Sequence, residues 1–90
     1  MTPVRWTTAA ADQLEAIVTR IREDNPEAAR ATAQTILDHI AQLETFPGIG
    51  RPGERKDTRE LIAGSYVIVY RLTSGTAEIL FIWHRAQDWR

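Results

Sequence analysis

Two groups of side chains in this sequence could carry acid–base chemistry or bind phosphate. His84 and Arg85 are neighbours in the C-terminal part of the chain, and an imidazole exchanges protons near neutral pH. The second group is a basic cluster made of Arg51, Arg55, Lys56 and Arg59. Guanidinium groups bind phosphate or acidic peptides through paired hydrogen bonds. Both groups are therefore candidates for a catalytic or binding site.

Each group also has an interpretation without chemistry. A lone histidine at the end of a strand is commonly bonded to the backbone, and no activated neighbour accompanies His84. The basic cluster is interleaved with Glu54, Asp57 and Glu60, which nearly neutralise it and make a solvated loop an equal alternative. The histidines, His39 and His84, lie on different expected elements and the chain has no cysteine. We therefore expect no metal site.

Residues 48–53, with the sequence GIGRPG, match the glycine pattern of dinucleotide-binding loops. Such a loop must connect a strand to a helix, so that the helix N-terminus meets the pyrophosphate. Here the motif follows an expected helix, which Phe46-Pro47-Gly48 ends, and Pro52 lies inside it. The segment 47–58 is accordingly predicted to be a polar, turn-rich loop, and no cofactor is expected.

Composition limits the classes of protein. Ninety residues suit a single domain spanning 1–90 with a small core. The net charge is −1, with a slight acidic excess in the first half and a slight basic excess in the second. This balance is far from the basic character of proteins that bind nucleic-acid backbones. The absence of cysteine, of a long apolar run and of an apolar leader near Met1 predicts a cytoplasmic protein without membrane contact.

The first half of the chain predicts a helical hairpin. A short edge strand at residues 4–6 precedes Thr7 and Thr8, either of which can cap a helix, and Asn25-Pro26 restarts a second helix. The apolar stripe of the first helix consists of Ala10, Leu14, Ile17, Val18 and Ile21. That of the second helix consists of Ala29, Ala33, Ile36, Leu37, Ile40 and Leu43. The short connection makes the helices antiparallel neighbours.

The second half predicts strands. A short strand at residues 59–62, turned by Ala63-Gly64, leads into two apolar runs that Ser74-Gly75 joins as a two-residue hairpin loop. Counting outward places Thr73 opposite Thr76 and Arg71 opposite Glu78, an ion pair that favours this register. The order β-α-α-β-β-β indicates an α+β fold, with the helical hairpin packed on a small antiparallel sheet.

The same counting assigns side chains to the two faces of the hairpin. One face is predicted to combine Tyr66, Tyr70, Phe81 and Trp83, which we interpret as the floor on which the helices pack rather than a platform for stacking bases. Both faces are largely apolar, so a partner is expected to cover the second face. Trp89 either folds back on the sheet or marks a contact surface.

Two segments together resemble the RelE/ParE superfamily of toxins from bacterial type II toxin–antitoxin systems. They are GRPGERKDTRELIAGSYVIVYRL, at residues 50–72, and EILFIWHRAQDW, at residues 78–89. The alanine-rich helical hairpin also fits, and the resemblance is strongest to the ParE-like plasmid-stabilisation branch. It implies a toxin that a cognate antitoxin protein neutralises, acting on DNA gyrase in the ParE-like branch or cutting mRNA on the ribosome in the RelE-like branch.

This sequence departs from the RelE-like pattern where that branch carries basic residues. Val67 replaces the arginine that follows the first tyrosine of the central strand, Thr58 and Glu60 replace lysines, and Gln87 replaces a late arginine. Arg59 and His84 are the candidate catalytic groups that remain for an mRNA endonuclease. The resemblance therefore favours a gyrase inhibitor that acts by binding; the endonuclease and a non-toxic, antitoxin-binding remnant stay as alternatives.

We expect contact residues for the target or the antitoxin at one end of the sheet, with Trp89 as an apolar anchor. They are Arg51, Arg59, His84, Arg85, Asp88 and Trp89.

Overall fold

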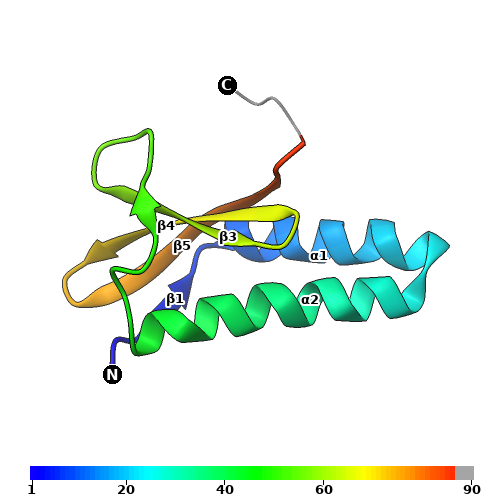
Figure 1. Ribbon diagram of the computed structural model, residues 1–90, viewed down its shortest axis with the longest axis horizontal. Coiled ribbons are helices and arrows are strands. Elements are labelled where there is room, and N and C mark those ends of the chain that lie inside the picture. Colours follow the sequence, from blue (N-terminus) through cyan, green and yellow to red (C-terminus); the bar gives the residue numbers. More distant parts are fainter. Residues whose placement is uncertain (87–90) are drawn as a thin grey trace.

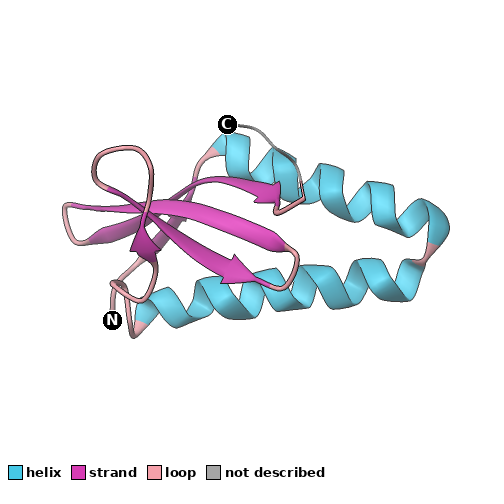
Figure 2. Cartoon of the chain, turned by 45° about the horizontal axis from the view of Figure 1, so that its top comes forward, coloured by secondary structure: helices cyan, strands magenta, loops and turns pink. Residues whose placement is uncertain are grey.

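A computed structural model describes residues 1–86 as two layers, a helical hairpin and a twisted sheet (Figures 1 and 2). The elements in chain order are β1 (Val4–Trp6), α1 (Thr8–Asp24), α2 (Pro26–Ala41), the 3-10 turn η1 (Gln42–Glu44), β2 (Arg51–Pro52), β3 (Thr58–Ala63), β4 (Tyr66–Thr73) and β5 (Thr76–His84). The predicted α+β fold is confirmed, with one further short strand, β2, inside the segment that the sequence assigned to a loop.

Both helices begin where the sequence predicts. The Thr7 hydroxyl accepts a hydrogen bond from the Ala10 amide at 3.2 Å. The Asn25 side chain accepts one from the Ala28 amide at 3.0 Å, and Pro26 occupies the first turn of α2. Each cap satisfies an amide that the helix itself leaves without a partner. Since Asn25 both ends α1 and caps α2, the two helices run antiparallel (Figure 1).

The sheet has the strand order β1-β5-β4-β3-β2. Its pairs are antiparallel except β1 with β5, which is parallel. The expectation of a wholly antiparallel sheet is corrected at this edge. The reason is topological: α1 and α2 separate β1 from the other strands in the sequence, and so long a connection allows β1 to pair with β5 in either direction.

The central hairpin has the predicted register at its tip. Ser74 and Gly75 form the loop with φ of 51° and 75°, the pair of positive values that a type I′ turn requires. Thr73 pairs with Thr76, and Arg71 pairs with Glu78. The preceding turn lies one residue later than predicted, because Ala63 pairs with Tyr66 and the loop is Gly64-Ser65, with φ of 61° at Gly64.

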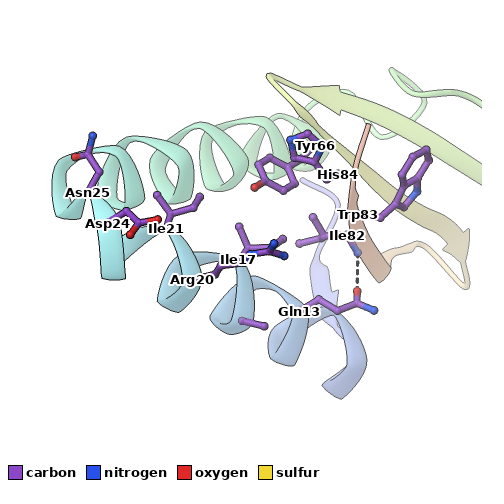
Figure 3. Close-up of a pocket in the computed structure, with 11 residues that line it drawn as sticks. Gln13, Ile17, Arg20, Ile21, Asp24, Asn25, Tyr66, Ile82, Trp83 and His84 are labelled. Atoms are coloured by element: carbon purple, nitrogen blue, oxygen red, sulfur yellow. Dashed lines mark hydrogen bonds between the residues drawn. The ribbon is translucent and has the colours of Figure 1, made fainter. Parts of the chain in front are cut away.

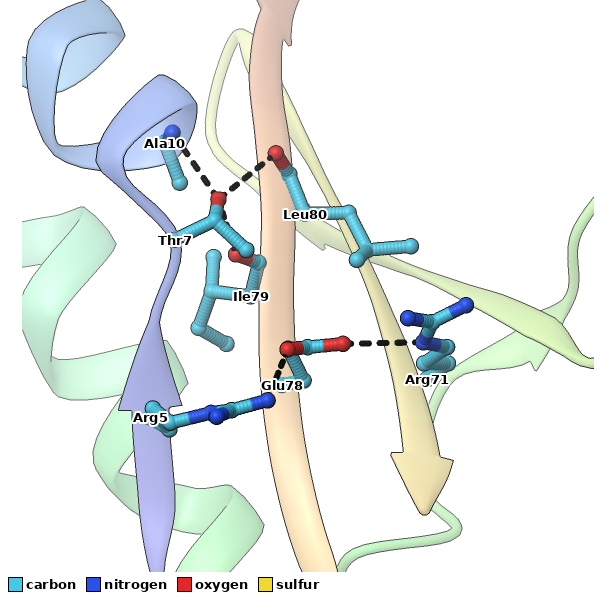
Figure 4. Close-up of polar contacts among 7 residues, drawn as sticks. All are labelled: Arg5, Thr7, Ala10, Arg71, Glu78, Ile79 and Leu80. Carbon is cyan, nitrogen blue, oxygen red and sulfur yellow. Dashed lines mark hydrogen bonds and ion pairs between the residues drawn. The ribbon is translucent and has the colours of Figure 1, made fainter.

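The predicted faces of the hairpin are wrong beyond a β-bulge in β5. Tyr70 pairs with Ile79 but Val69 pairs with Phe81, so Leu80 is an extra residue. Because side chains alternate along a strand, the insertion moves Phe81 and Trp83 to the face away from the helices. The Thr7 hydroxyl lies within 2.7 Å of the Ile79 carbonyl oxygen and 3.0 Å of that of Leu80, and donates to this pair (Figure 4).

The core lies between the helices and the sheet face that carries Tyr70. The largest fully buried side chains among the described residues are Tyr70, Ile36, Leu43, Ile68, Ile79 and Val67. All but Val67 belong to one apolar cluster, in which Ile82 replaces the Phe81 and Trp83 that the sequence placed there. Leu37 departs from its predicted stripe and is 44% exposed. None of the helices in residues 1–86 is long and apolar enough to cross a bilayer.

Candidate functional site

The predicted site residues fall into two groups that the fold keeps apart. Arg59 pairs across the sheet with Tyr70, whereas His84 pairs with Tyr66. These two tyrosines are four positions apart on β4, which is about 13 Å along the strand. The expectation that the contact residues share one end of the sheet is therefore wrong for Arg59 and His84, because the register of β4 with its two neighbours sets them at opposite ends.

Arg51 lies beside Glu60 on the short β2–β3 ladder. Its Nε and Nη2 atoms donate to Glu60 Oε1 at 3.2 and 3.1 Å. The Glu60 side chain is almost completely buried, while Arg51 is mostly exposed. A buried carboxylate requires such a partner, so Arg51 holds β2 on the edge of the sheet. More than half of the Arg51 side chain still faces solvent.

Arg59 forms hydrogen bonds with the loop made of residues 46–50, which we call the 46–50 loop. Its Nη1 atom donates to the carbonyl oxygen of Gly50 at 2.8 Å and to that of Gly48 at 3.3 Å. The other basic residues of the predicted cluster, Arg55 and Lys56, are exposed. The arginine that looked like a phosphate ligand is thus engaged with backbone carbonyl groups.

Tyr70 fixes the same loop from within the core. Its hydroxyl donates to the Pro47 carbonyl at 2.8 Å and accepts from the Gly50 amide at 2.9 Å. Burial raises the pKa of Tyr70, while the Gly50 amide and the charge of Arg59 act in the opposite direction. Gly50 must be glycine here, because a Cβ atom would lie 2.8 Å from the Tyr70 ring and hydroxyl. Gly50 of the glycine motif thus allows the loop to pack closely against Tyr70.

Glu78 joins three strands on the face of the sheet away from the helices. It accepts from Arg71 Nε at 2.8 Å and forms an ion pair with Arg5 of β1 (Figure 4). The hydrogen bond from Arg71 is the main cause of the lowered pKa of Glu78, and Arg5 adds to it. The predicted pair of Arg71 with Glu78 is confirmed. The charge of Arg71 is therefore already paired with a carboxylate, whereas a nuclease would direct such a charge at phosphate.

His84 and Arg85 lie at the end of β5, beside the β3–β4 turn. The His84 ring makes an edge-to-face contact with Tyr66, with ring centroids 5.0 Å apart, and its Nδ1 accepts from the Ala86 amide at 3.0 Å. The Arg85 amide donates to the Ser65 carbonyl at 2.8 Å. These contacts match the structural interpretation of His84. The predicted contact residues Asp88 and Trp89, with Gln87, lie outside the described residues.

A groove of 660 Å³ runs between α1 and the end of β5 (Figure 3). Ile17 and Ile21 of α1 face Ile82, Tyr66 and His84 across it. It is lined by Gln13, Ala16, Ile17, Arg20, Ile21, Asp24, Asn25, Tyr66, Ile82, Trp83 and His84. An apolar floor with a few polar groups at its rim is the usual character of a binding groove.

Gln13 forms the inner end of this groove. Its Oε1 atom accepts a hydrogen bond from the Ile82 amide at 2.7 Å. Because β1 ends at Trp6, which pairs with Ile79, the side chain of Gln13 satisfies an amide on the part of β5 that β1 does not reach. An exposed strand edge invites unwanted pairing, and α1 closes it at this position.

Sequence reasoning missed several of these residues. Gln13 and Arg20 gave no signal, since polar residues on an amphipathic helix are ordinarily solvated, and Ile17 and Ile21 were counted only as core. Phe46, which the sequence assigned only to the end of the second helix, is 60% exposed.

The two histidines do not meet. His39 is partly buried on α2, with Nδ1 2.7 Å from the Thr35 carbonyl oxygen. Within residues 1–86, no three histidine, cysteine or acidic side chains converge to hold a metal ion.

Comparison with known proteins places the chain. Residues 4–89 match the family described as the ParE toxin of the type II toxin–antitoxin system parDE. Y4kP, a candidate toxin of Sinorhizobium fredii, is 39% identical over 88 residues, which are 96% of this chain and 91% of Y4kP.

Solved structures agree with this placement. A chain of the chromosomal ParDE system of P. aeruginosa superposes with a TM-score of 0.83 and 28% identity, covering 93% of this chain and 96% of its own length. A chain of the toxin–antitoxin complex RelBE2 of Mycobacterium tuberculosis superposes with a TM-score of 0.69 and 26% identity. The match covers 93% of this chain and 98% of that chain. The predicted resemblance is confirmed: this chain belongs to the ParE toxin family of type II toxin–antitoxin systems, within the RelE/ParE superfamily.

Proposed function

We propose that this chain is a toxin that inhibits DNA gyrase by binding it, and that a cognate antitoxin neutralises it. Membership of the ParE family supports the toxin assignment. The observation that supports binding over RNA cleavage is the separation of Arg59 from His84, about 13 Å along the sheet. Activating a 2′-hydroxyl and stabilising charge on the adjacent phosphate requires groups that converge on one point.

The partners of the basic side chains support the same proposal. Arg51 is paired with Glu60, Arg71 with Glu78, and Arg59 with two backbone carbonyl groups. These cations hold strands and a loop together. A nuclease built from them would have to break contacts that maintain its own fold.

The groove between α1 and β5 is the proposed binding site of the antitoxin. Both structural neighbours come from toxin–antitoxin systems, and an extended or helical segment can lay its apolar side chains into such a groove. Ile17 and Ile21 would supply the apolar floor, with Arg20 and Asp24 at the rim. The segment would also reach the apolar face of the sheet that carries Phe81, which the helices leave uncovered.

The contact residues expected from the sequence remain proposed contacts with the target or the antitoxin. They are Arg51, Arg59, His84, Arg85, Asp88 and Trp89. Alanine at all six should weaken toxicity, antitoxin affinity or both. Because Arg59 also holds the 46–50 loop, a second variant keeps Arg59 and replaces the other five. Full toxicity and full antitoxin affinity in both variants would contradict this set of contacts.

The decisive experiment measures DNA supercoiling and DNA cleavage by purified gyrase at increasing concentrations of this protein. We expect loss of supercoiling together with trapped cleavage complexes, and recovery when the antitoxin is added in equal amount. Folded protein that binds its antitoxin but leaves gyrase unaffected would refute the proposal. Cutting of mRNA on translating ribosomes would then identify an endonuclease, and inactivity in both assays would identify an antitoxin-binding remnant.

A further inference from the structure

The 46–50 loop is held rigidly although it lies on the surface. Its backbone makes a turn in which the Ile49 amide donates to the Phe46 carbonyl at 3.1 Å. The hydroxyl of Tyr70, a fully buried residue, bonds both the Pro47 carbonyl and the Gly50 amide. With Arg59 bound to the carbonyl groups of Gly48 and Gly50, every residue of the loop takes part in a hydrogen bond.

This rigid backbone displays two large apolar side chains. Phe46 is 60% exposed and Ile49 is 49% exposed. Leu72, two positions beyond Tyr70 on the same face of β4, is also 42% exposed. Apolar side chains gathered on a surface mark contact sites, and a loop that is already ordered loses little conformational entropy when a partner binds it.

We propose that the 46–50 loop is the part of this toxin that engages its folded target, with Phe46 and Ile49 inserted into an apolar pocket of that protein. The inference rests on the proposed function and takes gyrase as the target. The loop offers side chains and no free run of amide and carbonyl groups, so a partner cannot add to it as a strand. It must supply a preformed pocket, which a folded protein has and an extended antitoxin segment lacks.

The charge beside the loop specifies the rim of that pocket. Within residues 1–86, Arg59 contacts carbonyl oxygens and forms no ion pair with a carboxylate. Its positive charge is therefore left for a partner. Arg51 adds a guanidinium whose side chain is 58% exposed. An apolar pocket with acidic side chains at its rim has the complementary chemistry.

None of the described residues that line the groove belongs to the 46–50 loop, which lies at the opposite end of α2 from Asn25. Asn25, which caps the start of α2, lines the groove, whereas the 46–50 loop follows the end of the helix and η1 (Figure 1). A helix of 16 residues is about 24 Å long. A segment seated in the groove therefore need not cover Phe46 or Ile49, and changes in the loop should separate target binding from antitoxin binding.

The test replaces Phe46 and Ile49 together by alanine and compares the variant with the wild-type protein and with Leu37→Ala. Leu37 is a matched control because it is also a large exposed apolar side chain but lies on α2. Gyrase inhibition is titrated, antitoxin affinity is measured by calorimetry, and the oligomeric state by light scattering. We expect the double variant to need at least about tenfold more protein for half-inhibition, with antitoxin affinity and the Leu37→Ala control unchanged.

Each other outcome overturns the inference in a recognisable way. If the double variant inhibits gyrase at the same concentrations as the wild-type protein, the loop is not part of the target interface. Equal loss of antitoxin affinity shows that the antitoxin occupies the loop. A wild-type dimer that the double variant dissociates shows that a second copy occupies it. If the wild-type protein itself leaves gyrase unaffected, the proposed function fails and this inference fails with it.

Discussion

Tyr70 and Gly50 are joined by a hydrogen bond in which the buried phenol accepts from the glycine amide at 2.9 Å. There is no room between them, since a Cβ atom on Gly50 would lie 2.8 Å from the Tyr70 hydroxyl and 2.9 Å from the Glu60 carbonyl oxygen. Gly50→Ala should therefore destabilise the protein by about 1–3 kcal/mol. Thermal or denaturant unfolding measures this loss. Gly48→Ala is the control, because a Cβ atom there meets nothing within 4 Å.

The pKa of Tyr70 predicts a loss of stability in alkali. Burial raises the pKa of this phenol above its ordinary value of 10.0, so the folded protein holds the proton more tightly than the unfolded chain. The resulting stabilisation is complete below pH 10 and is lost as the pH rises toward the folded-state pKa. Tyr70→Phe should weaken the fold at pH 7, because the Gly50 amide and the Pro47 carbonyl lose their partner, and should also remove this alkaline dependence.

Melting temperatures from pH 8 to about pH 11 test this prediction. Tyr66→Phe is the matched control, because it removes a phenol from the same strand and leaves the bonds of Tyr70 in place. A Tyr70→Phe variant whose stability falls in alkali as steeply as that of the wild-type protein would disprove the assignment.

Glu78 predicts the opposite dependence, in acid. Its pKa is lowered from 4.5, first by the hydrogen bond from Arg71 and then by the charge of Arg5. A lowered folded-state pKa contributes stability above the unfolded value, and this contribution is lost as the pH falls through the folded-state pKa. Glu78→Gln should reduce stability at pH 7 and flatten the decline below pH 4.5. Unfolding curves from pH 7 to about pH 3 measure both effects, with the exposed Glu23→Gln as control.

Gln13 should prove structural although it lines the groove. Gln13→Ala leaves the Ile82 amide without its acceptor, which costs about 1 kcal/mol for a partly buried group. Gln13→Glu keeps an acceptor oxygen and should retain most of the stability. Amide exchange at Ile82 is the direct measurement: it should be faster in the alanine variant alone. Equal protection in both variants would show that another group bonds this amide.

The separation of Arg59 from His84 predicts that replacing each residue changes a different part of the protein. Arg59→Ala removes the donor to the Gly48 and Gly50 carbonyl groups, so amide exchange in the 46–50 loop should become faster. His84→Ala should leave that loop unchanged. If the protein acts by binding, His84→Ala should lower its affinity for the target or the antitoxin only partly. If the protein were a nuclease that relies on His84, the same substitution would abolish RNA cleavage.

Local sequence was sufficient for both helices, for every strand except β2, and for one register. The caps at Thr7 and Asn25 and the Ser74-Gly75 loop depend on side chains and backbone angles within a few residues, and these features are present as predicted. Arg71 then meets Glu78 by counting from the turn. The family resemblance rested on two segments, residues 50–72 and 78–89, and the family match confirms it.

Tertiary structure decided the faces of β5 and the composition of the site. The bulge at Leu80 lies where the hydroxyl of Thr7 reaches the carbonyl groups of Ile79 and Leu80 from more than 70 positions away in the chain. No local pattern encodes that contact, yet the one extra residue moves Phe81 and Trp83 to the other face. The partners of Arg59 are likewise set by the fold, because a guanidinium binds whichever acceptors three-dimensional packing brings to it.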